Sequence, residues 1–131
     1  MTAKEKKELQ ALKRKCYHLW NKLVKDKAGN KCEHCGKTKR LNAHHIEGYI
    51  TNKGLRYEAR NGLCLCPRCH KFGWFSAHNS FVFMYLIMTE KRLDDLLFLI
   101  EMRGKKVDLT KNYLENKINE LLLSSMKKRA I

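Results

Sequence analysis

The sequence predicts a single α+β domain in which a short segment rich in cysteine and histidine lies between helical segments. Apolar residues recur every three or four positions before residue 30 and again after residue 79, which is typical of amphipathic helices. Between Asn30 and Ser76 this period disappears, and the segment holds five of the six Cys and four of the six His. A chain of 131 residues with 44% hydrophobic residues is sufficient for one domain with one modest core.

The N-terminal section, residues 1–29, predicts a basic amphipathic helix that ends at Gly29. Its apolar positions are Leu9, Leu12, Cys16, Leu19, Trp20, Leu23 and Val24. The lysines and arginines between them form either a solvated face or a face that contacts DNA. The net charge is +15, of which residues 1–31 carry +7, residues 32–78 carry +5 and residues 79–131 carry +3. Such a field attracts polyanions, nucleic acid above all.

The middle section, residues 30–78, contains two Cys-x-x-Cys pairs separated by 30 residues. The four thiols are those of Cys32, Cys35, Cys66 and Cys69. Two such knuckles can close a tetrahedral site of four thiolates, which is the geometry that Zn²⁺ prefers, and a fully thiolate-bound zinc has a structural role. A disulfide scaffold and a redox Cys-x-x-Cys are the less favoured interpretations. Cys16 and Cys64 are expected to be buried thiols.

The C-terminal section, residues 79–131, returns to helical spacing. Helices are expected over Phe81–Met88, over Leu93–Met102 before Gly104, and over Leu114–Met126 with a start near Thr110. Their apolar faces are expected to pack on the domain or on a second copy of the chain, which would make a homodimer. The longest apolar run has eight residues, far below the roughly 20 of a membrane span, and no signal-peptide core is found, so we expect a cytoplasmic protein without membrane contact.

Histidines lie inside the loop that the four thiols would close. His44 and His45 are adjacent, so on an extended segment their side chains point to opposite faces and serve two roles. Together with Asn61 and His70, within AHHI and NGLCLCPRCH, they resemble the HNH endonucleases of the ββα-metal fold, many of which carry the same two Cys-x-x-Cys pairs. The resemblance covers about residues 30–78 and predicts a small zinc-stapled ββα-metal core with flanking N-terminal and C-terminal helices.

This resemblance implies a hydrolase that cuts DNA phosphodiester bonds with one divalent cation, Mg²⁺, Mn²⁺ or Ni²⁺. His44 and His70 would bind the cation, His45 would be the general base, and Asn61 would hold the segment that bears His45. In a continuous helix His78 would lie about 12 Å beyond His70, too far to share a metal. Gly73 can break that helix and bring His78 back as an auxiliary ligand or phosphate contact.

The stretch Leu55–Asn61 is also similar to the phage recombination nucleases of the NinG/Rap group, which act on branched DNA. That resemblance implies DNA, including branched DNA, as the partner, and a phage protein in the cytosol of a bacterial host. His44-His45-Ile46 and His70 depart from the group's pattern and bring the site closer to general HNH enzymes. Candidate phosphate contacts form two groups: Arg56, Arg60 and Lys71 near the site, and Lys37, Lys39 and Arg40 as a second cluster.

Two interpretations from other classes stay open. A non-catalytic zinc-ribbon module would bind nucleic acid with steep salt dependence and leave it intact. A protein-interaction adaptor that uses the apolar C-terminal helices would neither bind nor cut nucleic acid.

Overall fold

The computed structural model describes residues 1–48 and 50–129, and these form an α+β fold of helices around a two-stranded sheet. The elements in chain order are α1 (Ala3–Lys27), β1 (Asn42–His45), η1 (Lys53–Leu55), η2 (Ala59–Asn61), β2 (Gly62–Leu65), η3 (Arg68–Phe72), α2 (Phe81–Lys91), α3 (Leu93–Met102) and α4 (Lys111–Arg129). The helices expected from apolar spacing are confirmed close to their predicted bounds.

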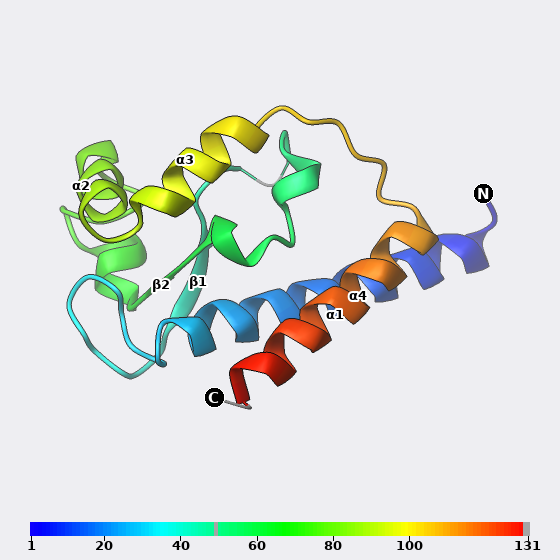
Figure 1. Cartoon of the computed structure of the whole chain (residues 1–131), viewed down its shortest axis with the longest axis horizontal. Coiled ribbons are helices and arrows are strands. Elements are labelled where there is room, and N and C mark those ends of the chain that lie inside the picture. The colour runs from blue at the N-terminus through cyan, green and yellow to red at the C-terminus, as the bar shows by residue number, and fades with distance from the viewer. Residues whose placement is uncertain (49, 130–131) are drawn as a thin grey trace.

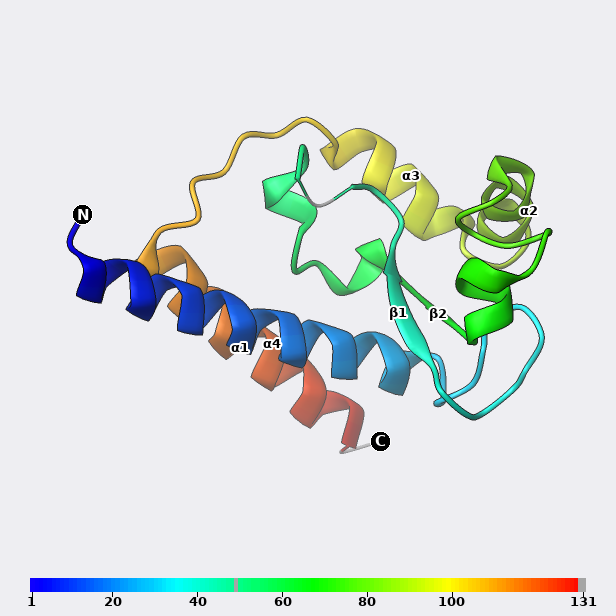
Figure 2. The ribbon, with the colours of Figure 1, turned by 180° about the vertical axis from the view of Figure 1, so that it is seen from behind.

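The helices cover both faces of the sheet (Figures 1 and 2). α1 and α4 lie side by side, run in the same direction and pack on one face. α2 and α3 lie on the other face, next to η3. Among residues 1–48 and 50–129, no helix has both the length and the apolar character needed to span a bilayer.

The strand β2 divides the core into two clusters because its side chains alternate between the faces of the sheet. Leu63 and Leu65 belong to the cluster beneath α2 and α3, whereas Cys64 belongs to the cluster beneath α1 and α4. All three side chains are fully buried. The burial of Cys64 and Cys16 confirms the prediction for these two thiols.

α1 packs close to the sheet because β2 begins with glycine. A Cβ atom on Gly62 would lie 2.2 Å from a methyl group of Val24 and 3.1 Å from the ring of Trp20. Gly62 is paired with His45 in the antiparallel register, so the same close approach brings α1 against the end of β1. Trp20 is fully buried there, and its indole N–H donates to the carbonyl of Glu58 at 2.8 Å.

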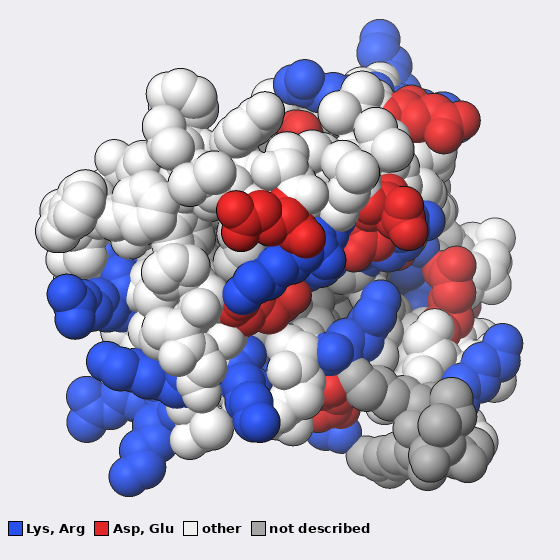
Figure 3. All heavy atoms as spheres, turned by 60° about the vertical axis from the view of Figure 1, so that its left-hand side comes forward, with Lys and Arg blue, Asp and Glu red and all other residues white. Residues whose placement is uncertain are grey.

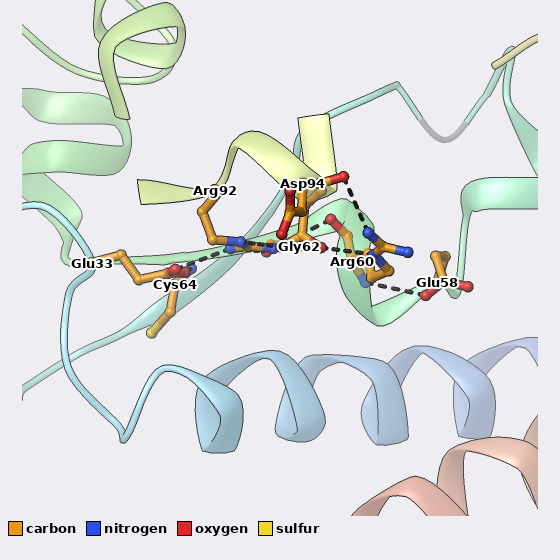
Figure 4. Close-up of polar contacts among 8 residues, drawn as sticks. Glu33, Glu58, Arg60, Gly62, Cys64, Arg92 and Asp94 are labelled. Carbon is orange, nitrogen blue, oxygen red and sulfur yellow. Dashed lines mark hydrogen bonds and ion pairs between the residues drawn. The ribbon is translucent and has the colours of Figure 1, made fainter. Parts of the chain in front are cut away.

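Arg92, at the junction of α2 and α3, ties the helices to the sheet and to the loop after α1 (Figure 4). Its guanidinium donates to Glu33 Oε1 and to the Gly62 carbonyl, each at 3.0 Å, and to the Arg60 carbonyl at 3.3 Å. The second carboxylate oxygen of Glu33 accepts the backbone N–H of Cys64 at 2.7 Å. One largely buried ion pair therefore joins three parts of the chain.

α2 and α3 also present exposed apolar side chains, among them Phe81, Tyr85, Leu97 and Ile100. The described surface shows these residues without a covering segment of this chain, so their contact with a second copy stays a prediction.

Candidate metal centres

The four cysteines of the two knuckles come together as predicted. Cys32 and Cys35 lie in the loop after α1, Cys66 follows β2 and Cys69 lies in η3. The four sulfurs all lie within 4.8 Å of one another. Zinc bound tetrahedrally at about 2.3 Å sets its sulfurs about 3.8 Å apart, so the thiols fit a structural metal such as zinc.

The surroundings of this cluster favour the ionised form of one thiol, that of Cys66, whereas burial raises the pKa of Cys35 and Cys69. Although burial opposes ionisation, hydrogen bonds from the backbone of Cys69 and from the neighbouring thiols lower the pKa of Cys66 to about 7. The sulfurs of Cys35 and Cys66 are 3.5 Å apart. His34 lies against the cluster as well, with Nδ1 3.3 Å from Cys69 Sγ. In the sequence, only the position of His34 between Cys32 and Cys35 indicated its contact with Cys69.

A second cluster consists of the three histidines His44, His70 and His78. Their ligand nitrogens also lie within 4.8 Å of one another, and the ring centroids are 4.7 to 5.1 Å apart. His70 Nε2 and His78 Nε2 face each other at 3.1 Å. Two nitrogens on one ion at about 2.1 Å lie roughly 3.0 to 3.4 Å apart, so this pair already has the spacing of shared ligands. Among the described residues, the group contains imidazoles and no carboxylate.

His78 reaches the cluster because the chain turns back after η3, as expected from Gly73. The backbone N–H of His78 donates to the carbonyl of His70 at 3.1 Å, and that of Ala77 donates to Cys69 at 2.8 Å. These bonds set residues 77 and 78 beside residues 69 and 70. The separation of about 12 Å between His70 and His78 expected for a continuous helix therefore does not apply. The auxiliary position predicted for His78 is therefore brought together with His44 and His70.

The electrostatics of the cluster favour neutral imidazole rings at His44 and His70. Burial lowers the pKa of His44 to about 4, and the nearby His70 and His78 add to this because a second positive charge among them is unfavourable. Burial also lowers the pKa of His70. Neutral imidazoles carry the lone pairs that a metal ion requires.

His45 points away from this cluster, as adjacent positions on a strand require. Its ring stacks on that of Trp20, with centroids 3.9 Å apart and planes 9° apart. Its Nε2 lies 2.8 Å from the Arg56 carbonyl. A carbonyl only accepts, so Nε2 carries the proton and, in the neutral ring, Nδ1 carries the lone pair. The half-buried ring has a pKa below its ordinary value, chiefly because of burial.

Asn61 fixes the chain directly after His45. Its fully buried side chain accepts the backbone N–H of Glu47 at 2.7 Å and donates to the carbonyls of Glu47 at 3.1 Å and Leu55 at 3.0 Å. Its own carbonyl accepts from Ile46 at 3.2 Å. These contacts give Asn61 the holding position expected of it.

The predicted phosphate contacts divide into exposed and engaged residues. Lys37, Lys39, Arg40 and Lys71 are exposed. Arg60 instead pairs with Asp95 at 2.7 Å, and its guanidinium lies 4.1 Å from the ring centre of Phe98. Arg60 therefore has partners within the fold, and its contact with phosphate stays a prediction. The half-buried Arg56 interacts with the Tyr57 hydroxyl and supplies the carbonyl that holds His45.

Comparison of the chain with protein-family models, with curated proteins and with solved structures finds no match.

Replacing His44, His70 or His78 with alanine is expected to lower the affinity of the zinc-loaded protein for Ni²⁺ by about tenfold or more. Loss of outer partners of metal ligands costs about 10- to 100-fold in affinity, and a direct ligand contributes at least as much. Isothermal titration with Ni²⁺ measures the effect. His18→Ala, which removes an exposed histidine of α1, is the matched control and should bind as the wild type does. Unchanged affinity in the three cluster variants would show that the cluster does not bind metal.

Proposed function

We propose that this protein is a metal-dependent endonuclease of the HNH type that hydrolyses DNA phosphodiester bonds. The observation that carries the proposal is the convergence of His44, His70 and His78, with the ring of His45, the next residue of the same strand, separately held and oriented. A zinc ion on the four cysteines would be structural, because all four positions are thiolates and none remains for substrate.

The three histidines would hold the catalytic cation. When bound there, a divalent cation supplies Lewis-acid stabilisation of the charge that develops on the phosphate. Imidazole ligands suit Ni²⁺ or Zn²⁺ better than Mg²⁺ or Mn²⁺, which prefer oxygen ligands. Of the three ions expected from the sequence, Ni²⁺ therefore fits these residues best.

His45 would take a proton from the attacking water through Nδ1. Stacking on Trp20 and the bond to the Arg56 carbonyl fix both the orientation and the tautomer of the ring. The lowered pKa keeps the ring neutral at pH 7, as a general base requires. Asn61 would keep the segment after His45 in place through its bonds to the backbone of Glu47.

The partner would be DNA, held through its phosphates by the exposed cations Lys37, Lys39, Arg40 and Lys71. A cytosolic location would keep the six cysteines reduced. A small nuclease of this kind is compatible with a phage or another mobile element.

Supercoiled plasmid incubated with the zinc-loaded protein tests this proposal. Nicking or linearisation is expected with added Mn²⁺ or Ni²⁺ and not in EDTA. Intact plasmid with every cation, together with intact synthetic four-way junctions, would refute the nuclease function.

One observation favours the zinc-ribbon module as a second candidate. His45 is half-buried and its ring packs on α1, which is also how a purely structural histidine would be held. That module would bind DNA with a strong dependence on salt and would leave it intact.

The pH dependence of cleavage should reflect the environment of His45. A base is active when neutral, so the rate falls as pH drops through its pKa. Because burial lowers the pKa of His45, half-maximal kcat/KM is expected below pH 6.5, the ordinary value for histidine. Measurements of kcat/KM from pH 5 to 8, with zinc content checked at each pH, give the pH at which the rate is half-maximal. A half-maximal rate at or above pH 6.5 would contradict the assignment of His45 as the general base.

A further inference from the structure

An exposed tryptophan lies on the loop that joins two of the three clustered histidines. Trp74 is 84% exposed, whereas tryptophan side chains are on average highly buried. It stands between His70 and His78 in the sequence, and the other tryptophan of the chain, Trp20, is fully buried. The exposed indole next to the histidine cluster is suited to a ligand with a flat face that can stack on it.

Trp74 borders a basic hollow. A cavity of about 310 Å³ is lined by Trp74, Phe75, Lys37 and Arg68 together with the cysteine knuckles. A second hollow of about 490 Å³ is lined by the same Lys37 and Arg68 and by further cations of the loop after α1. The two hollows adjoin at the shared Lys37 and Arg68, and no Asp or Glu of the described chain lines either of them. Lys and Arg side chains also gather at the lower left of the face in Figure 3.

The loop that carries Trp74 is held in place. A Cβ atom on Gly73 would lie 2.8 Å from the carbonyl of Arg68, so only glycine lets the chain pass this close to η3. The Asn79 side chain donates to the carbonyls of Lys71 and Gly73, each at 2.8 Å. The backbone that bears Trp74 is therefore held close to Arg68 before any ligand arrives.

We infer that this hollow binds single-stranded DNA, with an unpaired base stacked on Trp74 and the adjoining phosphates on Lys37 and Arg68. Alternating aromatic and cationic side chains in one groove is how proteins bind single strands without reading sequence. The bases of a duplex are already stacked on one another and offer no free face, so the indole selects unpaired bases. The inference rests on the proposed action on DNA and names the form of DNA that the site takes.

The hollow and the histidine cluster both take a residue from η3, Arg68 for the hollow and His70 for the cluster. Trp74 also lies in the loop between His70 and His78, so a strand bound on it would lie near the three histidines. The substrate is accordingly DNA with an unpaired segment next to the scissile phosphate, such as a flap, a gap or a branch point.

Binding of two 12-nucleotide strands, oligothymidine and an abasic strand with the same phosphates, tests the inference. The zinc-loaded protein is used with no other cation, so cleavage is not part of the readout. Oligothymidine is expected to quench tryptophan fluorescence, because Trp74 is the exposed indole, and to bind about 5- to 100-fold more tightly than the abasic strand. Trp74→Ala removes that difference in affinity and Trp74→Phe keeps most of it.

Two further variants separate stacking from other effects. Phe81→Ala removes an aromatic side chain that is also 84% exposed and does not line the hollow, so it should bind both strands as the wild type does. Lys37→Ala should weaken the binding of both strands about equally and reduce the dependence of their affinity on salt. Equal affinity of the wild type for the two strands overturns the stacking site alone. Plasmid and synthetic four-way junctions both left intact with added Mn²⁺ or Ni²⁺, despite base-dependent binding, overturn the nuclease function alone.

Discussion

Replacement of His45 by alanine is expected to lower the rate of plasmid cleavage by about 10²- to 10⁴-fold, the usual contribution of a general base. The zinc content and the helical circular dichroism should stay those of the wild type. Some stability should be lost, about 1 kcal/mol, because the ring stacks on Trp20 at 3.9 Å. Gel assays of initial rates with Mn²⁺ or Ni²⁺ measure the effect.

Imidazole added to the His45→Ala protein provides the sharper test. The space left beside Trp20 can admit a free imidazole. The free imidazole replaces the base, although it is not covalently attached to β1 as the His45 side chain is. Partial recovery of cleavage is expected for this variant and not for His70→Ala, in which a metal ligand is missing. His18→Ala is the control for loss of a histidine elsewhere, and it should cleave normally. Near wild-type cleavage by His45→Ala would remove His45 from the chemistry.

Cys66→Ser is expected to abolish zinc binding and cooperative unfolding. A structural zinc contributes apparent binding free energies of about 10 to 16 kcal/mol in small domains, which exceeds the net stability of most domains of this size. Cys66 also joins β2 to η3, so its loss separates the sheet from the turn that carries His70. Metal analysis and thermal melts measure both effects.

Cys64→Ala is the matched control for this substitution. Cys64 lies two residues earlier, is fully buried and is not part of the four-sulfur cluster. This variant should keep one equivalent of zinc and a cooperative transition, at a cost of about 1 to 2 kcal/mol for the small cavity. A Cys66→Ser protein that melts cooperatively without zinc would contradict the structural role of the metal.

Features with a local cause could be predicted from the sequence. The apolar spacing gave α1 and the helices after residue 79, and the two knuckles marked the four sulfurs that meet. The opposite directions of His44 and His45 followed from the period of a strand. Each of these depends on residues close together in sequence or on one ligand geometry.

Features that depend on distant partners could not be predicted. Trp20 was expected only as a core residue of α1, yet it supports the ring of His45, 25 positions away. The ion pair of Arg60 could not be predicted, because its partner Asp95 lies on a helix 35 residues further along. Trp74 carried no signal, since its exposure depends on how the loop folds against Arg68.

The position of Arg92 bears on how small a working version of this protein can be made. The section proposed to form the nuclease core ends near residue 78, but the cation that neutralises Glu33 comes from the junction of α2 and α3. A fragment trimmed to that stretch would leave a carboxylate uncompensated and would strip Leu63 and Leu65 of the helices that shield them from water. The flanking helices are thus part of the minimal folding unit, and transplanting the site into another scaffold would require them.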